Sequence, residues 1–193
     1  MRQKSNFIFF IKPISAIGLI LVFLASCKNS SKEINDFLAD KNLPVGVAEN
    51  MNHVYKDSGK VTSRLIAPVF WDFKNRKLNP YSEFPKGVKI VNINRVSRDS
   101  VTILGDYAIS YEKTRVSEII GHVVVINHLN GVILNTDQMY WDQKEKYYFT
   151  KSPFTIYTET DTLTGVGFES ESNLSNWILN NTQGDFIVNQ KEK

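Results

Sequence analysis

Three histidines are the side chains in this sequence best suited to acid–base chemistry or to holding a metal ion. His53 stands alone, whereas His122 and His128 lie six positions apart, on either side of an apolar run. In an extended chain that spacing places both on one face of a strand, too far apart to bind one ion together. No acidic or sulfur ligand falls at a spacing that would complete a site. The sequence therefore predicts no metal site and no cofactor.

Carboxylates near aromatic residues are the other candidates for chemistry, because a pair of carboxylates can hydrolyse a glycosidic bond. The candidates are Asp72, Asp142, Glu145, Glu159 and Asp161. No two of them form a recognisable pair in the sequence, and carboxylates of this kind are usually just solvated in loops. The chain also has no serine in a nucleophile elbow and no glycine-rich loop before a helix. We therefore predict a protein that is not an enzyme.

The single cysteine, Cys27, ends the tetrapeptide Leu24-Ala25-Ser26-Cys27. Basic residues precede twelve uncharged residues, 14–25, as in an export signal, and this run is too short to span a bilayer comfortably. The pattern resembles a bacterial lipobox. The resemblance implies that residues 1–26 are removed and that Cys27 is lipidated on its sulfur and acylated on its new N-terminus. An ordinary secretory signal with a chance cysteine, and an uncleaved helix that starts near Phe7, remain as alternatives.

The charge of the remaining chain argues against nucleic acid as a partner. Removing Arg2, Lys4 and Lys12 from the 23 basic residues leaves as many as the 20 acidic residues, so the net charge is about zero. No basic helix or ribbon that would bind a phosphate backbone is evident. With Cys27 modified, no disulfide within the chain is possible. A chain of this length suits one domain with its own core.

Beyond residue 50 the hydrophobic period is two, which is typical of strands with one buried face. Ile34, Phe37 and Leu38 predict a short amphipathic helix before that point. Asn130-Gly131 is the strongest hairpin signal, because both residues tolerate the positive φ of a type I′ turn. The predicted strands are 61–73, 88–96, 101–111, 116–126, 132–141, 147–157, 162–168, 177–180 and 186–188. Many short strands separated by turns predict an all-β sandwich, jelly roll or barrel.

Several segments, in their order along the chain, resemble the LptC family of lipopolysaccharide export proteins over roughly residues 50 to 190. They are Asp57-Ser58-Gly59-Lys60-Val61 with Leu65-Ile66-Ala67-Pro68, Gly121-His122-Val123-Val124, Asn130-Gly131 through Leu134-Asn135-Thr136 to Tyr140-Trp141-Asp142, and Gly165-Val166-Gly167-Phe168-Glu169-Ser170. The glycines of these motifs are Gly59, Gly121, Gly131, Gly165 and Gly167. The motifs are glycine and alternation patterns with no catalytic signature.

The resemblance implies an all-β, open antiparallel jelly roll whose V-shaped apolar groove takes the acyl chains of lipopolysaccharide. Its implied partners are lipopolysaccharide, the inner-membrane lipopolysaccharide ABC transporter and a periplasmic LptA-like bridge protein that joins by strand-edge pairing. The implied domains are a signal peptide over 1–26, a lipidated tether over 27–50, the jelly roll over 51–190 and a polar tail over 191–193. Alternation predicts the groove-lining residues Val69, Trp71, Val101, Ile103, Tyr107, Ile109, Trp141 and Phe154.

The predicted lipobox departs from the best-known members of the family, which keep an N-terminal transmembrane helix. We expect a lipid anchor on the periplasmic side of the inner membrane, beside the transporter, with the outer membrane as the alternative. Two other interpretations stay open. One is an outer-membrane or surface lipoprotein that holds a glycan on exposed aromatic residues, and the other is a lipoprotein carbohydrate hydrolase.

Overall fold

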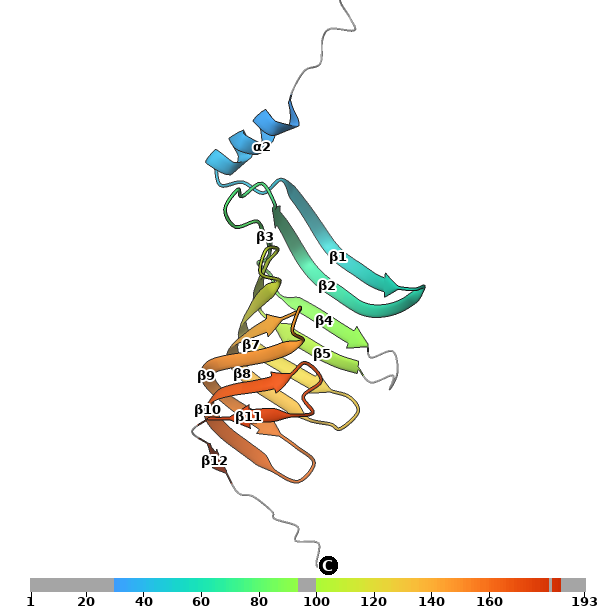
Figure 1. Ribbon diagram of the computed structural model, residues 1–193, viewed down its shortest axis with the longest axis vertical. Coiled ribbons are helices and arrows are strands. Elements are labelled where there is room, and N and C mark those ends of the chain that lie inside the picture. The colour runs from blue at the N-terminus through green and yellow to red at the C-terminus, as the bar shows by residue number, and fades with distance from the viewer. Residues whose placement is uncertain (1–29, 94–99, 181, 185–193) are drawn as a thin grey trace, which may run out of the picture. The chain divides into compact units, whose positions relative to one another are not determined.

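A computed structural model describes residues 30–93, 100–180 and 182–184, which form one helix and twelve antiparallel strands (Figure 1). The helix is α2 (Ser31–Asp40). The strands are β1 (Gly46–Asp57), β2 (Lys60–Phe73), β3 (Tyr81–Phe84), β4 (Val88–Ile93), β5 (Ser100–Gly105), β6 (Tyr107–Tyr111), β7 (Val116–Asn127), β8 (Ile133–Asp142), β9 (Tyr147–Tyr157), β10 (Thr162–Glu171), β11 (Trp177–Leu179) and β12 (Gln183–Gly184). The predicted all-β, jelly-roll-like fold is confirmed.

The short helix predicted around Ile34, Phe37 and Leu38 is confirmed as α2. Its first turn is capped by Ser30, whose carbonyl oxygen accepts from the Glu33 amide at 2.9 Å. Asn42 has a φ of +54°, a left-handed conformation that commonly ends helices. The Leu43 amide then donates to the Leu38 carbonyl at 2.8 Å, which satisfies one of the last free carbonyl groups of the helix.

Two long strands change partners along their length and so hold the sheet together. β2 pairs with β4 through Ser63–Ile66 and then with β3 through Trp71–Phe73, while β1 follows its other edge. β7 likewise pairs with β6 through Ser117–Ile120 and with β5 through Val124–Asn127. Because β3 also pairs with β6 and β4 with β5, the strands β2, β4, β5, β7, β6 and β3 form a closed circuit.

Irregularities interrupt the pairing of β7, β8 and β10. The register shifts in β7 between Ile120 and Val123, in β8 between Thr136 and Tyr140, and in β10 between Val166 and Phe168. The β7 irregularity contains two consecutive residues at positive φ, Gly121 (+78°) and His122 (+42°). Such bulges locally increase the bend of a strand. Beyond β7, strands β8 to β11 follow one another in antiparallel order (yellow to red in Figure 1).

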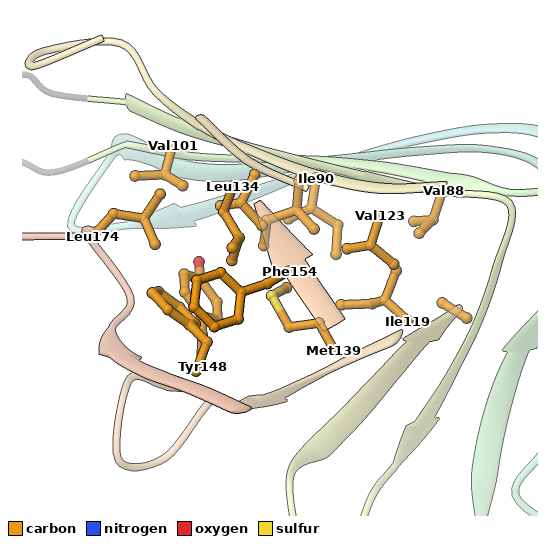
Figure 2. Close-up of a cluster of buried hydrophobic side chains, with 14 of the residues drawn as sticks. Val88, Ile90, Val101, Ile119, Val123, Leu134, Met139, Tyr148, Phe154 and Leu174 are labelled. Carbon is orange, nitrogen blue, oxygen red and sulfur yellow. The ribbon is translucent and has the colours of Figure 1, made fainter. Parts of the chain in front are cut away.

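The core lies between these bent strands. Figure 2 shows Leu134, Met139 and Phe154 in one cluster with side chains of the β4 and β7 strands. The most completely buried large side chains are Tyr148, Phe168, Ile103, Ile119, Leu134, Met139 and Ile156. Phe154 and Phe168 pack with ring centroids 5.7 Å apart. The whole core cluster draws on the nine strands β2 to β10, so its burial couples strands that are far apart in the sequence.

The predicted strand limits agree closely with the structure for the β7 to β10 region. The single strand predicted over 101–111 is wrong, because Asp106 divides it into β5 and β6. β1 begins at Gly46, inside the segment that we predicted to be a tether. Phe186–Val188, Cys27 and the predicted signal peptide lie outside the described residues.

Candidate functional site: a groove with unlike ends

A groove of about 1020 Å³ runs along the inner side of the strand circuit. Strand β2 carries lining residues from Thr62 to Asp72, which as extended chain is a length of about 33 Å. The other lining residues come from β1, β3, β4, β6, the start of β7, the end of β8 and the turns after β2, β6 and β8. A groove formed in this way can accept a long and narrow ligand.

The middle of the groove is apolar. Its floor consists of Leu65, Phe84, Val88, Ile90, Ala108 and Ile119, all at most 9% exposed. Cross-strand pairing brings them together, since Leu65 lies opposite Ile90, Phe84 opposite Ala108, and Ala108 opposite Ile119. Phe70 packs against this floor, with its ring centroid 5.5 Å from that of Phe84. The floor is continuous with the hydrophobic core, so the groove is a cleft in the core itself.

The β1–β2 hairpin forms one end of the groove. Met51, His53 and Tyr55 alternate along β1 and line the groove, whereas the intervening Val54 does not. The rings of His53 and Tyr55 meet edge to face at 4.4 Å. Tyr55 is 48% exposed, so this end presents aromatic surface to solvent.

Polar residues from three turns form the other end. Lys74 follows β2, Glu112 and Arg115 follow β6, and Gln143 follows β8. The Lys74 Nζ lies 3.3 Å from Glu112 Oε1 and 3.8 Å from Asp72 Oδ2. The ion pair with Glu112 joins the β2–β3 loop to the β6–β7 turn.

A hydrogen-bonded group of small polar side chains lies just inside this polar end. Gln143 Nε2 donates to the Ser117 hydroxyl at 2.8 Å, and Ser117 donates to Ser110 Oγ at 2.9 Å. Ser117 is only 4% exposed. Buried hydroxyl and amide groups are stable when they form hydrogen bonds with one another. These side chains do so, and they give this end of the groove a polar lining.

One aromatic residue of the groove has a polar atom that is buried without a partner. The indole Nε1 of Trp141, which lines the groove, has no hydrogen bond among the described residues. The Trp141 ring lies 6.2 Å from that of the buried Tyr148. Burial raises the pKa of Tyr148 well above its usual range, so its hydroxyl stays protonated.

The predicted groove-lining residues are placed in three different ways. Trp141 lines the groove. Val101, Ile103 and Phe154 are buried in the core. Val69, Trp71, Tyr107 and Ile109 are half-buried and do not line the groove. Whether any of the eight contacts a lipid stays a prediction.

A family model for lipopolysaccharide-assembly, LptC-related proteins matches residues 14–181. The chain belongs to the LptC family. This family takes part in lipopolysaccharide transport and is associated with the periplasmic side of the inner membrane. A search of curated proteins found no match.

The sequence-based prediction missed most groove residues of this LptC-family chain. Along two segments, the set of alternate side chains that faces inward shifts by one residue part-way. Ile103 faces inward before Asp106, whereas Ala108 and Ser110 face the groove after it. In β2, Leu65 lines the groove before Pro68, and Phe70 and Asp72 line it after. Gly105-Asp106 and Pro68 were the local signals of these two changes.

The five family-motif glycines serve turns and close contacts. Gly59 and Gly131 lie in turns at positive φ, and Gly167 lies at the β10 irregularity. A Cβ atom on Gly121 would lie 2.8 Å from Asp106 Oδ2, and one on Gly165 would lie 2.8 Å from the Phe154 ring. Neither glycine lines the groove, so both belong to the framework around it.

The histidines have separate surroundings. His122 Nδ1 lies 2.6 Å from Asp106 Oδ2, and this hydrogen bond raises the pKa of His122. His128 Nε2 lies 2.8 Å from the Thr102 hydroxyl. Across the described ranges, no three potential metal ligands among His, Cys, Asp and Glu gather, and no helix is long and apolar enough to cross a membrane.

Proposed function

We propose that this chain is a non-catalytic lipopolysaccharide transfer component. In this proposal it accepts lipopolysaccharide from the inner-membrane ABC transporter and passes it to a periplasmic LptA-like bridge protein, toward the outer membrane. The observation that carries the proposal is the groove of about 1020 Å³, with its floor of buried apolar side chains inside an LptC-family fold.

The chemistry of the floor suits acyl chains. Moving a methylene group from water to an apolar surface gains about 0.8 kcal/mol, so even one partly inserted acyl chain would bind appreciably. Leu65, Phe84, Val88, Ile90 and Ile119 present such a surface without a charged group between them. A lipid could therefore leave the membrane without exposing its chains to water.

Strand edges offer a means of joining neighbouring proteins. Among the described residues, β1 pairs only with β2 and β11 only with β10, so each strand has one edge without a partner strand. An edge strand can add a strand from another protein by backbone hydrogen bonding. We propose that one such edge meets the transporter and another the bridge protein.

We further propose that Cys27 is a lipid anchor that keeps the protein at the periplasmic side of the inner membrane. The lipobox-like tetrapeptide supports this anchor. Several acyl chains together hold a protein at a membrane much more firmly than one chain does. Mass spectrometry of the mature protein should find Cys27 as an acylated N-terminus, and an unmodified N-terminus at another residue would contradict the anchor.

Photo-crosslinking from neighbouring residues of β1 tests the transfer function. A photo-reactive residue at Tyr55, which lines the groove, should capture lipopolysaccharide while the transporter hydrolyses ATP. The matched control is Val54, which is similarly exposed (39% against 48%) but does not line the groove. We expect crosslinks from Tyr55 and few from Val54.

Other outcomes of this experiment would overturn the proposal. Equal capture from both positions would mean that the lipid contacts the hairpin non-specifically. No capture from Tyr55 or from a second groove position, Met51, in a folded protein would remove lipopolysaccharide as the ligand. Binding of a water-soluble glycan instead would support the glycan-binding lipoprotein.

A further inference from the structure

The two ends of the groove differ in charge. At the β1–β2 end the lining is aromatic, aliphatic and neutral polar, the last from Thr62, Ser63 and Asn92, whereas the end formed by the turns after β2, β6 and β8 carries the charged side chains. A ligand that was apolar along its whole length would gain nothing from burying Ser117 and Gln143 there. The contrast indicates a ligand with an apolar part and a polar part, bound in one direction.

Arg115 is the cation at the polar end that is not neutralised. Lys74 is paired with both Asp72 and Glu112, so its charge is balanced. No ion pair or hydrogen bond of the Arg115 guanidinium to another described residue is found, although this side chain lines the groove. A guanidinium binds a phosphate group well, because it can donate two parallel hydrogen bonds.

Trp141 stands between the polar end and the apolar floor. Its backbone pairs with that of Ser117 in the polar group, and its ring packs against the hydrophobic core. Its buried Nε1 has no acceptor among the described residues, and an unpaired buried donor costs about 1–3 kcal/mol. An indole N–H donates only, so the missing partner must be an acceptor such as a carbonyl oxygen.

We propose that the polar end of the groove binds the phosphate-bearing saccharide head of an acylated glycolipid, with its acyl chains directed toward the β1–β2 end. Arg115 binds the phosphate group, and the Trp141 indole N–H donates to an acyl carbonyl where the chains leave the head. This assignment rests on the proposed function and adds to it the direction of the lipid and the residues that recognise its head.

The test uses the full-length protein in detergent and two hexa-acylated probes, bisphosphorylated lipid A and the same lipid without phosphate. The wild-type protein should bind the phosphorylated probe more tightly. Arg115→Asn should lose about tenfold in affinity for the phosphorylated probe and little for the other, because a hydrogen bond to a charged group is removed. Arg115→Lys should recover part of the preference.

Asparagine suits this position, because Arg115 has a φ of +58° and asparagine tolerates the left-handed region. Lys146→Asn is a closely matched control. Lys146 is also an exposed cation in a turn at positive φ (+54°), and its carbonyl also accepts a backbone N–H, but it does not line the groove. This control should bind both probes as the wild type does.

Trp141→Phe keeps an aromatic ring and removes the donor. It should weaken binding of both probes by a similar factor of about five to ten and leave the phosphate preference intact. An analogue with ether-linked chains lacks the ester carbonyl groups and should lose less affinity. Trp71→Phe, at a half-buried tryptophan outside the groove, is the control.

The outcomes separate this inference from the proposed function. If the wild type binds neither probe, the proposed transfer function fails. If it binds both equally, or if Arg115→Asn and Lys146→Asn behave alike, the lipid function stands and the assignment of the polar end to the phosphate head is wrong.

Discussion

Gly121 shows how a single residue shapes the framework around the groove. It has a φ of +78°, and a Cβ atom there would lie 2.8 Å from Asp106 Oδ2 and 3.0 Å from Asp106 Cβ. The Asp106 amide also donates to the carbonyl oxygens of Ile120 and Gly121. The β5–β6 break therefore fits directly against the β7 irregularity, with no room for a side chain.

We expect Gly121→Ala to lower the free energy of unfolding by about 1–3 kcal/mol, from backbone strain and the close contact together. Chemical denaturation of the variant measures this loss. Gly59→Ala is the control, because Gly59 also has a positive φ (+77°) but a Cβ there meets nothing within 4 Å. Equal losses in the two variants would show that the contact with Asp106 contributes nothing.

His122 next to Gly121 predicts a dependence of stability on pH. Its hydrogen bond to Asp106 raises the pKa of His122, although the imidazole is exposed. The protonated pair therefore stabilises the fold fully below about pH 6.5, and this contribution is lost as the pH rises through the raised pKa. The melting temperature should fall slightly over that range in the wild type and stay level in His122→Asn. A raised pKa that persists in Asp106→Asn would contradict the pairing.

At the level of elements, β7 and β1 should differ in local stability. β7 pairs with β8 on one edge and with β5 and β6 on the other, and it carries the buried residues Ile119, Val123 and Val125. β1 pairs only with β2, and its residues from Asn52 to Asp57 are exposed. Strands with few buried contacts open locally at a low free energy.

Hydrogen exchange of backbone amides measures this difference. Amides of β1 that bond to β2 should exchange well before those of β7 and β8. They should do so by local unfolding of β1 while the other strands stay folded. Slow exchange throughout β1 would mean that the hairpin is as stable as the core, and its edge would then be less ready to rearrange around a partner strand.

Comparing β9 with β2 and β7 shows what local sequence can and cannot predict. The limits of β9 follow from alternation alone, because inward and outward side chains alternate without interruption along Tyr147–Tyr157. The groove depends instead on β2 and β7 changing partners, and those changes are set by contacts between distant segments such as Asp106 and Gly121. The sequence-based prediction continued the alternating pattern past Asp106 without a break. It therefore assigned Tyr107 and Ile109 to the groove, whereas Ala108 and Ser110 line it in the structure.

For the whole molecule, the groove and the core are parts of one hydrophobic cluster, which gives stability and ligand binding a common origin. Leu65, Val88, Ile90 and Ile119 belong to the core and also line the groove. Shortening them would damage both properties at once. A change that adds volume to the groove can separate the two, since it leaves the existing contacts in place.

Ala108→Leu is such a change, because Ala108 lies in β6 between Phe84 and Ile119 and lines the groove. Because Ala108 lines the groove, the larger side chain should extend into it and change the free energy of unfolding by no more than about 1 kcal/mol. Lipid capture by a photo-reactive residue at Tyr55 should fall several-fold, because the added side chain occupies the space for acyl chains. Ala67→Leu is the control, because Ala67 is buried as deeply as Ala108 (1% against 3% exposed) but does not line the groove. Overpacking there should destabilise the protein by about 1–3 kcal/mol. A similar loss in Ala108→Leu would show that the space beside Ala108 is closed core and not part of a lipid path.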